Sequence, residues 1–178
     1  MIRKYDASRR RKAAENTRGD ILQAALKLEA DIQNLLAVLR FANDPDERSR
    51  FLGRGNTLAQ ILVQPGDCPV SLLTLMASQD NLDRAVDLLS SNRYEAVMRD
   101  GLLAFKQTGR LSEFETRLRR YALRWLSSLI YKDPLGIGVF LGYQALKVNE
   151  IGNLRWIIQG IHLGLPAGEI KANLELAT

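Results

Sequence analysis

Apolar residues recur at the spacing of an α-helix along nearly the whole chain, and the strict alternation of a half-buried β-strand is almost absent. The longest such stretch, residues 17–42, predicts a single helix. Asn43-Asp44-Pro45 ends it, because proline removes a backbone donor and disfavours helix in the residue before it. The pattern therefore predicts an all-α protein, a multi-helix bundle. The buried stripe expected on this first helix is Ile21, Leu22, Ala25, Leu28, Ile32, Leu35, Leu36 and Leu39.

Capping residues place the helices in the middle of the chain. We expect Asp80 to cap a helix over 81–90 and Asn92 to cap one over 93–107, because these side chains accept hydrogen bonds from first-turn amides. Further helices are predicted near 57–63 and 70–77, and a capping box of Ser112 and Glu115 predicts the start of another.

The last third of the chain opens on an Asp-Pro pair. Asp133 is the predicted N-cap, and Pro134 takes the first helical position, where its missing donor costs nothing. The helix over 134–147 is apolar on nearly every side, so we expect it at the centre of the core. Gly138 and Gly142, four residues apart, would let two helix backbones approach closely.

A polar junction at 147–150 is expected to separate this helix from the next, over 151–163. Gly164 should end the second helix, and Pro166 should start a last one that ends near Leu176.

One short pattern occurs twice. Ile32-Gln33-Asn34-Leu35 and Ile151-Gly152-Asn153-Leu154 share the form Ile-x-Asn-Leu, an acid precedes each, and an apolar helical stretch follows each. This repetition predicts two related helical units rather than one irregular bundle. We place them at residues 1–60, with a basic N-terminal segment, and 61–178, packed as one body.

The formal charge of +5 is concentrated at one end. Residues 1–20 hold seven Lys or Arg against three acids, which leaves the remainder close to neutral. The run Arg9-Arg10-Arg11-Lys12 could bind nucleic acid, acidic lipid or an acidic protein face. A solvated helix face or a frayed terminus is the preferred interpretation of so short a run.

Little in the sequence supports catalysis. Cys68 is the single cysteine and His162 the single histidine, which excludes an internal disulfide and a zinc cluster built on cysteine. Gly53-Arg54-Gly55 lacks the Lys-Ser/Thr end of a phosphate-binding loop and is interpreted as a turn. No apolar run reaches the roughly 18 residues of a membrane span. We expect no cofactor and no metal ion.

Residues 133–176 resemble the C/d (AC39-like) subunit of V/A-type ATPases. In that family an Asp-Pro helix continues to a tyrosine, a Lys-x-x-Glu step and a Glu-x-x-Asn-Leu-Arg-x-Ile-Ile stretch. A glycine, a Gly-Leu-Pro turn and a Glu-x-Ile close then follow. The matching residues here are Asp133, Pro134, Tyr143, Lys147, Glu150, Asn153, Leu154, Arg155, Ile157, Ile158, Gly160, Gly164, Leu165, Pro166, Glu169 and Ile170.

The helix around Asn34, followed by the Gly-rich segment 51–55, is similar to the preceding unit of the same family. The resemblance therefore covers the second and third of the family's three units, so we expect a fragment, a truncated gene product or a split subunit. One departure is Ile161, where the family often has a lysine.

What the resemblance implies is a mechanical role. A subunit of this kind is a non-catalytic part of the central stalk that links the rotor shaft to the membrane ring. It couples ATP hydrolysis or synthesis to proton or sodium transport, on the cytoplasmic side and peripheral to the membrane. Its expected partners are the shaft subunits and the ring. The implied structural or interface residues are Asn34, Asp133, Pro134, Tyr143, Lys147, Glu150, Asn153, Arg155, Gly160, Gly164 and Pro166.

Two questions stay open at this point. Lys147, Glu150 and Arg155 would either pair within the fold, which we favour, or face the shaft or ring. The alternative function is a basic helical module that binds nucleic acid or acts as an adaptor, and a hydrolase that uses His162 is a third class.

Overall fold

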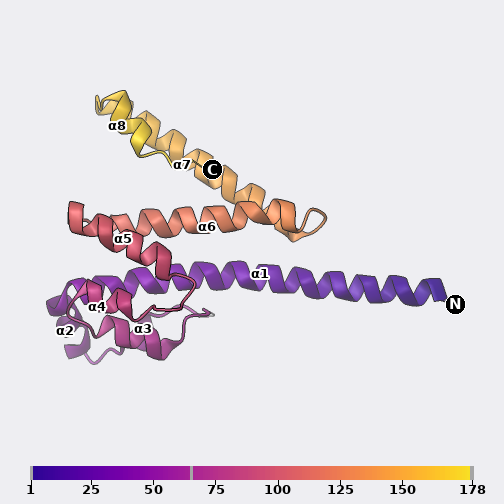
Figure 1. Cartoon of the computed structure of the whole chain (residues 1–178), viewed down its shortest axis with the longest axis horizontal. Coiled ribbons are helices and arrows are strands. Elements are labelled where there is room, and N and C mark those ends of the chain that lie inside the picture. Colours follow the sequence, from indigo (N-terminus) through magenta and orange to yellow (C-terminus); the bar gives the residue numbers. More distant parts are fainter. Residues whose placement is uncertain (1, 65, 177–178) are drawn as a thin grey trace. The chain divides into compact units, whose positions relative to one another are not determined.

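The computed structural model describes the backbone of residues 2–64 and 66–176, and the side chains of residues 19–64 and 66–176. The fold is all-α, as predicted, and no β-strand occurs in these ranges (Figure 1). The elements are α1 (Ile2–Asn43), α2 (Pro45–Gly53), a short 3-10 helix η1 (Leu58–Ile61), α3 (Val70–Ala77), α4 (Leu82–Asp87), α5 (Glu95–Thr108), α6 (Ser112–Lys132), α7 (Ile137–His162) and α8 (Ala167–Ala172).

The chain forms two compact units. Unit 1 comprises Met1–Gln23 with Ala122–Thr178, and unit 2 comprises Ala24–Tyr121. These boundaries reflect contacts within the chain, whereas the division at residue 60 concerns related helical units and stays a prediction. In the described residues no helix has the length and apolar character needed to cross a bilayer.

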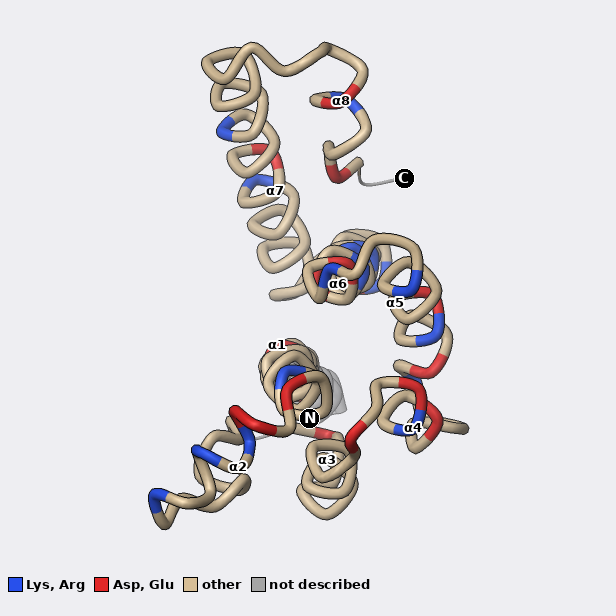
Figure 2. The backbone as a smooth tube through the Cα atoms, turned by 90° about the vertical axis from the view of Figure 1, so that its left-hand side faces the viewer, with Lys and Arg blue, Asp and Glu red and all other residues tan. Residues whose placement is uncertain are grey.

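Unit 2 is built on the carboxyl-terminal half of α1. In both views α3 and α4 lie beside this half of the helix (Figures 1 and 2). The predicted stripe is buried at Leu28, Ile32, Leu35 and Leu39. Its other members are not buried: Ile21, Ala25 and Leu36 are half-buried, and Leu22 is exposed. The side chains that complete this core are Leu73, Met76, Ala85, Val86, Leu89, Tyr94, Met98, Phe114 and Leu118.

The caps of unit 2 differ in part from those predicted. Asp44 caps α2 by accepting a hydrogen bond from the Glu47 amide at 2.8 Å, with α1 ending at the preceding residue. The N-cap of α4 is Asn81 and not Asp80, which pairs with Arg48 at 2.5 Å. This long-range ion pair occupies the carboxylate that would otherwise be free to cap.

The starts of α5 and α6 also differ from the predictions. Asn92 accepts from the Tyr94 amide at 3.0 Å, in a turn that precedes α5 instead of capping it directly. Ser112 is already the first residue of α6, so it is not the N-cap of a capping box, and Glu115 pairs with Arg119 at 2.5 Å.

Unit 1 contains a close approach of α7 to α6. A Cβ atom added to Gly142 would lie 2.6 Å from Ile130 Cγ1 and 2.8 Å from the Leu126 carbonyl oxygen. At Gly138 an added Cβ would lie 3.0 Å from the Leu129 carbonyl oxygen. Only glycine leaves room for this contact, so the predicted packing role of the two glycines is observed.

Two expectations for α7 are wrong. The helix runs without interruption from Ile137 to His162, because residues 147–150 contain neither glycine nor proline and continue it. It is also not at the centre of a core, since Phe140 is 62% and Tyr143 57% exposed. The residues of α7 that are buried are the glycines Gly138, Gly142 and Gly160.

Candidate functional site

Asn34 holds a backbone segment that follows it by 29 residues. The side chain is buried, its Nδ2 donates to the Val63 carbonyl at 2.9 Å, and its Oδ1 accepts from the Val63 amide at 2.7 Å. A carboxamide carries a donor and an acceptor side by side, so it satisfies both backbone groups of one residue. The pair ties α1 to the segment that follows η1.

Asn153 makes the same two bonds in unit 1. Its Nδ2 donates to the Glu175 carbonyl at 2.9 Å, and its Oδ1 accepts from the Glu175 amide at 3.0 Å. Asn149 adds a third bond to that carbonyl at 2.8 Å. We call Asn34 with Val63, and Asn153 with Glu175, the two asparagine clasps. The repeated Ile-x-Asn-Leu pattern therefore corresponds to a repeated structural device.

Asp31, which precedes the first Ile-x-Asn-Leu segment, is a fully buried carboxylate. Its Oδ1 accepts from the Cys68 amide and its Oδ2 from the Tyr94 hydroxyl, both at 2.9 Å. The Arg93 guanidinium lies 3.7 Å from Oδ2 and over the Tyr94 ring. Because a buried charge is costly without partners, these donors are what allow Asp31 to sit in the core.

Two groups beside Asp31 keep their protons. Burial raises the pKa of Tyr94 far above its usual range, and the charge of Asp31 acts in the same direction. Burial, followed by the charge of Asp31, raises the pKa of the Cys68 thiol to about 12. Tyr94 therefore stays a hydrogen-bond donor, and Cys68 stays a thiol that is a poor nucleophile at neutral pH.

Glu150, the acid before the second Ile-x-Asn-Leu segment, is exposed instead of buried. It accepts a hydrogen bond from Lys147 at 2.7 Å, and this bond raises the pKa of Lys147. The ammonium of Lys147 also lies 5.8 Å from the centre of the Tyr143 ring. Arg155 is exposed and forms no ion pair among the residues whose side chains are described.

Asp133 acts at the start of α7, but not as the N-cap. The N-cap of α7 is Gly136. Pro134 lies in the turn before Gly136, and its side chain is exposed. Asp133 Oδ2 accepts from the Gly138 amide at 2.9 Å, so its carboxylate still satisfies a first-turn donor. The helix begins three residues later than the Asp-Pro pair predicted, because residues 133–136 form a turn first.

The end of α7 is a glycine turn. Gly164 adopts φ of +68°, the Leu165 amide donates to the Gly160 carbonyl at 2.9 Å, and the Gly164 amide donates to the Ile161 carbonyl at 3.1 Å. This two-bond pattern at a left-handed glycine closes the helix, as the sequence predicted. Pro166 is the N-cap of α8.

Gly160 lets α8 fold back onto α7. A Cβ atom added there would lie 2.7 Å from Ile170 Cγ1, and the Trp156 indole donates to the Ile170 carbonyl at 3.2 Å. Gly160 is thus a packing position, and α8 covers only the last turns of α7.

Catalytic candidates are not brought together. In the described part of the chain no group of three or more His, Cys, Asp or Glu side chains could hold a metal ion. His162 is exposed at the end of α7. The backbone of Arg9-Arg10-Arg11-Lys12 is helical, but these side chains lie outside the described residues, and a role for them stays a prediction.

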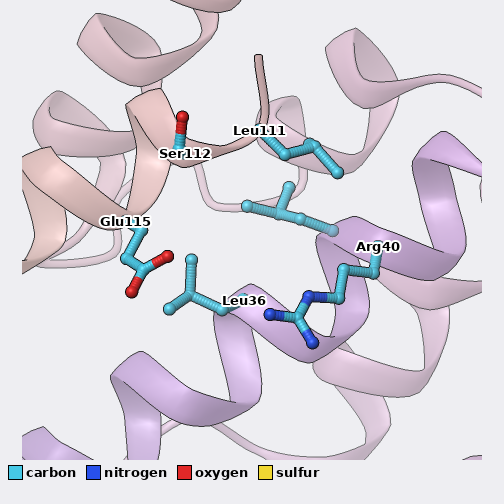
Figure 3. A pocket seen from close by; sticks show the side chains of 6 residues that line it. Leu36, Arg40, Leu111, Ser112 and Glu115 are labelled. Atoms are coloured by element: carbon cyan, nitrogen blue, oxygen red, sulfur yellow. The ribbon is translucent and has the colours of Figure 1, made fainter. Parts of the chain in front are cut away.

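A small hollow lies between α1 and the start of α6 in unit 2 (Figure 3). Its volume of about 100 Å³ is below the several hundred Å³ that an organic ligand needs. Arg40 and Glu115 reach it from the two helices, and Glu115 already pairs with Arg119. The hollow is lined by Leu36, Leu39, Arg40, Leu111, Ser112 and Glu115.

The sequence of this chain is similar to those of known proteins. A sequence model described as "ATP synthase (C/AC39) subunit" matches residues 4–173. The chain belongs to the C/AC39 subunit family. The C subunit of the A-type ATP synthase of Methanobrevibacter smithii is 29% identical over 86% of the chain and 39% of its own length.

Two further relatives carry the same description. The C subunit of the A-type ATP synthase of Methanocaldococcus jannaschii is 24% identical over 82% of the chain and 35% of its own length. That of Pyrococcus abyssi is 25% identical over 64% of the chain and 30% of its own length. The chain thus spans well under half the length of these C/AC39 relatives. No solved structure shows significant similarity to it.

The buried acid of this C/AC39 chain, Asp31, precedes an Ile-x-Asn-Leu segment but is not among the site residues that the resemblance implied. Asp31 is buried, whereas Lys27 on the same helix pairs with the more exposed Asp67 at 2.9 Å. A signal for Asp31 is present, because it lies three residues after Leu28 and four before Leu35, within the buried stripe. Its partner Tyr94, 63 residues away, has no such signal.

Proposed function

We propose that this chain is a non-catalytic central-stalk subunit of a V/A-type rotary ATPase or ATP synthase. In this role it links the rotor shaft to the membrane ring, so that ATP hydrolysis or synthesis is coupled to proton or sodium transport. It works on the cytoplasmic side, peripheral to the membrane through the complex. Membership of the C/AC39 family over residues 4–173 carries the proposal.

The local structure supports a mechanical role. A part that transmits torque must not shear where a helix meets the segment that follows it. Each asparagine clasp joins a long helix to a later segment through two hydrogen bonds, at 2.7–2.9 Å in unit 2 and 2.9–3.0 Å in unit 1. A sliding displacement of the segment along the helix would lengthen both bonds of a clasp together and so weaken both.

The candidate residues divide by their surroundings. Asn34, Asn153, Asp133, Gly160 and Gly164 bond or pack within their own unit, which favours a structural role. The other candidates are exposed: Pro134, Tyr143, Lys147, Glu150, Arg155 and Pro166. Lys147 and Glu150 pair with each other, which favours the pairing within the fold that we preferred from the sequence, and contact with the shaft or ring is the proposed role of the other four.

Co-purification tests the proposal. The affinity-tagged full chain, expressed in the organism that encodes it, is expected to elute with the shaft and ring subunits of an A-type or V-type ATPase. An equally tagged unrelated helical protein serves as the control. A chain that never associates with either, even when a full set of ATPase subunits is present, would refute the function.

A second arm addresses the basic-module alternative. If the chain bound nucleic acid through Arg9-Arg10-Arg11-Lys12, duplex binding would fall steeply with salt and vanish when residues 2–18 are deleted. We expect no such duplex binding. The interaction with the ATPase subunits is measured in the same buffers, so that the two kinds of binding can be compared directly.

A further inference from the structure

Asp31 uses both of its carboxylate oxygens to join three segments of unit 2. Its Oδ1 accepts from the Cys68 amide and its Oδ2 from the Tyr94 hydroxyl, each at 2.9 Å. Asp31 itself is fully buried on α1. One carboxylate thus connects α1 both to the segment before α3 and to the turn before α5. We call this arrangement, Asp31 with the Cys68 amide and the Tyr94 hydroxyl, the Asp31 latch.

The two bonds of the Asp31 latch are expected to break together. A Cβ atom added to Gly66 would lie 2.6 Å from Asp31 Oδ1, so backbone fills this side of the carboxylate. A buried charge that loses a donor must regain one from water, because an unsatisfied buried acceptor costs more than a typical hydrogen bond contributes. Water that enters to replace one donor also competes with the other donor. The latch is therefore either closed or open as a whole.

The turn that carries Tyr94 is strained. Ser91 adopts φ of +67°, and among the described residues it is the one non-glycine residue with a positive φ. The Ser91 amide donates to Glu95 at 2.8 Å, and Asn92 accepts from the Tyr94 amide at 3.0 Å. Strain of this kind persists only where surrounding contacts impose it, and the bond of Tyr94 to Asp31 is one such contact. Opening of the Asp31 latch therefore releases strain as well as breaking bonds.

Charged side chains of alternating sign lead from the solvent to the Asp31 latch. The side chain of Asp67 is 44% exposed, and it lies 2.9 Å from the Lys27 ammonium and 3.5 Å from the Arg93 guanidinium. Arg93 in turn donates to the Tyr94 hydroxyl. Asp67 and Arg93 each precede a residue of the latch in the sequence, so their contact holds the two donor segments to each other. Dissolved salt screens charges at such exposed positions far more than it screens buried ones.

We propose that the Asp31 latch is a conformational switch that ionic strength controls. At low salt the outer charges hold the latch closed, and Cys68 stays buried. At high salt the contacts of Asp67 weaken, and the two donors leave Asp31 as one unit while the Asn34 clasp stays formed. The switch lies wholly within unit 2, so it does not depend on the proposed function.

Amide hydrogen exchange of the full chain at low and high salt tests the switch. Raising the KCl concentration from about 0.01 M to about 1 M shortens the screening length from about 30 Å to about 3 Å. The Cys68 amide is expected to exchange about fivefold faster at high salt, the change that follows from the loss of exposed ion pairs. The Val63 amide is the internal reference, because a neutral side chain, Asn34, accepts from it at 2.7 Å. Its exchange should change by less than about twofold.

Asp67→Asn removes the exposed charge and keeps the size of the side chain. The salt response of the Cys68 amide is then expected to fall below about twofold. The matched control is Asp83→Asn, because the Asp83 side chain is 45% exposed and pairs with Lys106 elsewhere in unit 2. This control should keep the response of about fivefold. Comparing two salt concentrations within each variant cancels the effect of a substitution on the intrinsic exchange rate of its neighbour.

Tyr94→Phe tests whether the two bonds break together. It removes the hydroxyl that donates to one carboxylate oxygen, whereas the Cys68 amide bonds to the other. If the Asp31 latch opens as a unit, the Cys68 amide should exchange about tenfold faster in this variant. The Cys68 thiol should then also react with a thiol reagent while the chain is folded. The control is Tyr121→Phe, which removes a hydroxyl from the ring packed 5.6 Å from that of Tyr94 and should leave both measurements unchanged.

Three results would overturn the inference. Equal acceleration of the Cys68 and Val63 amides would mean that unit 2 unfolds as a whole. An unchanged Cys68 amide in Tyr94→Phe would mean that the two bonds break independently. A salt response that is absent from the unsubstituted chain, or that survives in Asp67→Asn, would remove ionic strength as the control of the switch.

Discussion

The Asn34 clasp gives the most direct test of how this fold is held together. Asn34→Ala removes a side chain that is 1% exposed and breaks both hydrogen bonds to Val63, which are 2.9 and 2.7 Å long. A typical intramolecular hydrogen bond contributes about 0.5–1.5 kcal/mol net, so the two together contribute about 1–3 kcal/mol. Truncating a buried side chain also leaves a cavity, which adds a further cost. We therefore expect the free energy of unfolding to fall by about 2–4 kcal/mol.

The adjacent residue supplies a matched control. Gln33 carries the same amide group on the same helix, but it is exposed, and its side chain donates to Glu29, four residues away, at 3.0 Å. Exposed side-chain pairs at this spacing contribute about 0.2–0.5 kcal/mol. Gln33→Ala should therefore be close to neutral, and the difference between the two variants isolates the clasp.

Urea unfolding followed by circular dichroism measures the global effect, and amide hydrogen exchange at Val63 measures the local one. The Val63 amide donates to Asn34 Oδ1, so its exchange should accelerate in Asn34→Ala and stay unchanged in Gln33→Ala. If both variants lose the same stability, within about 0.5 kcal/mol, and the Val63 amide exchanges equally in both, the clasp does not hold the segment.

The remaining predictions concern the helix contact, the thiol and the start of α7. Gly142→Ala should destabilise the chain by about 1–3 kcal/mol, because its Cβ would meet the Leu126 carbonyl oxygen at 2.8 Å. Gly152→Ala, with open space around its Cβ, should stabilise the chain by about 0.5–1 kcal/mol. Thermal unfolding of the two variants measures both changes. With its pKa raised to about 12 from 9.0, Cys68 should not react with a thiol reagent at pH 8 until the chain unfolds in urea. Because the folded state holds the thiol proton more tightly than the unfolded state, the free energy of unfolding is highest below pH 9 and falls as the pH rises toward 12. Cys68→Ala should remove this fall from the curve of unfolding free energy against pH. Asp133→Ala should cost about 1 kcal/mol in urea unfolding, since it leaves a first-turn amide of α7 without its acceptor, while Asp133→Asn should retain most of that stability.

The buried acid of unit 2 and the exposed acid of unit 1 show how one sequence pattern serves two environments. Asp31 and Glu150 both precede Ile-x-Asn-Leu, and each asparagine makes the same two bonds. They differ in what lies on the helix face beside them. Asp31 is enclosed by donors from residues 68–94, whereas Glu150 is bonded to Lys147 on its own helix.

The sequence by itself determined the local features of this protein. Helical periodicity predicted the all-α fold, Asn43-Asp44-Pro45 predicted where α1 ends, and Gly164 predicted where α7 ends, because backbone geometry at proline and glycine depends on the residue itself. The repeated Ile-x-Asn-Leu pattern predicted related helical units, and that division stays a prediction. What the structure shows is that the asparagine of each copy bonds both backbone groups of a later residue.

Only the tertiary structure decided which apolar faces are covered and which polar groups meet. Residues 134–147 are as apolar as any core helix, yet Phe140 and Tyr143 are exposed, because burial depends on whether another element packs against that face. The hydrogen bond between Asp31 and Tyr94 joins residues 63 positions apart. The helical spacing of apolar residues relates only neighbouring turns of one helix, so it cannot indicate a contact of this sequence separation. Side-chain pattern records which residues favour burial, but contact depends on where the rest of the chain folds, and that is why α1 and α7 share a pattern but not an environment.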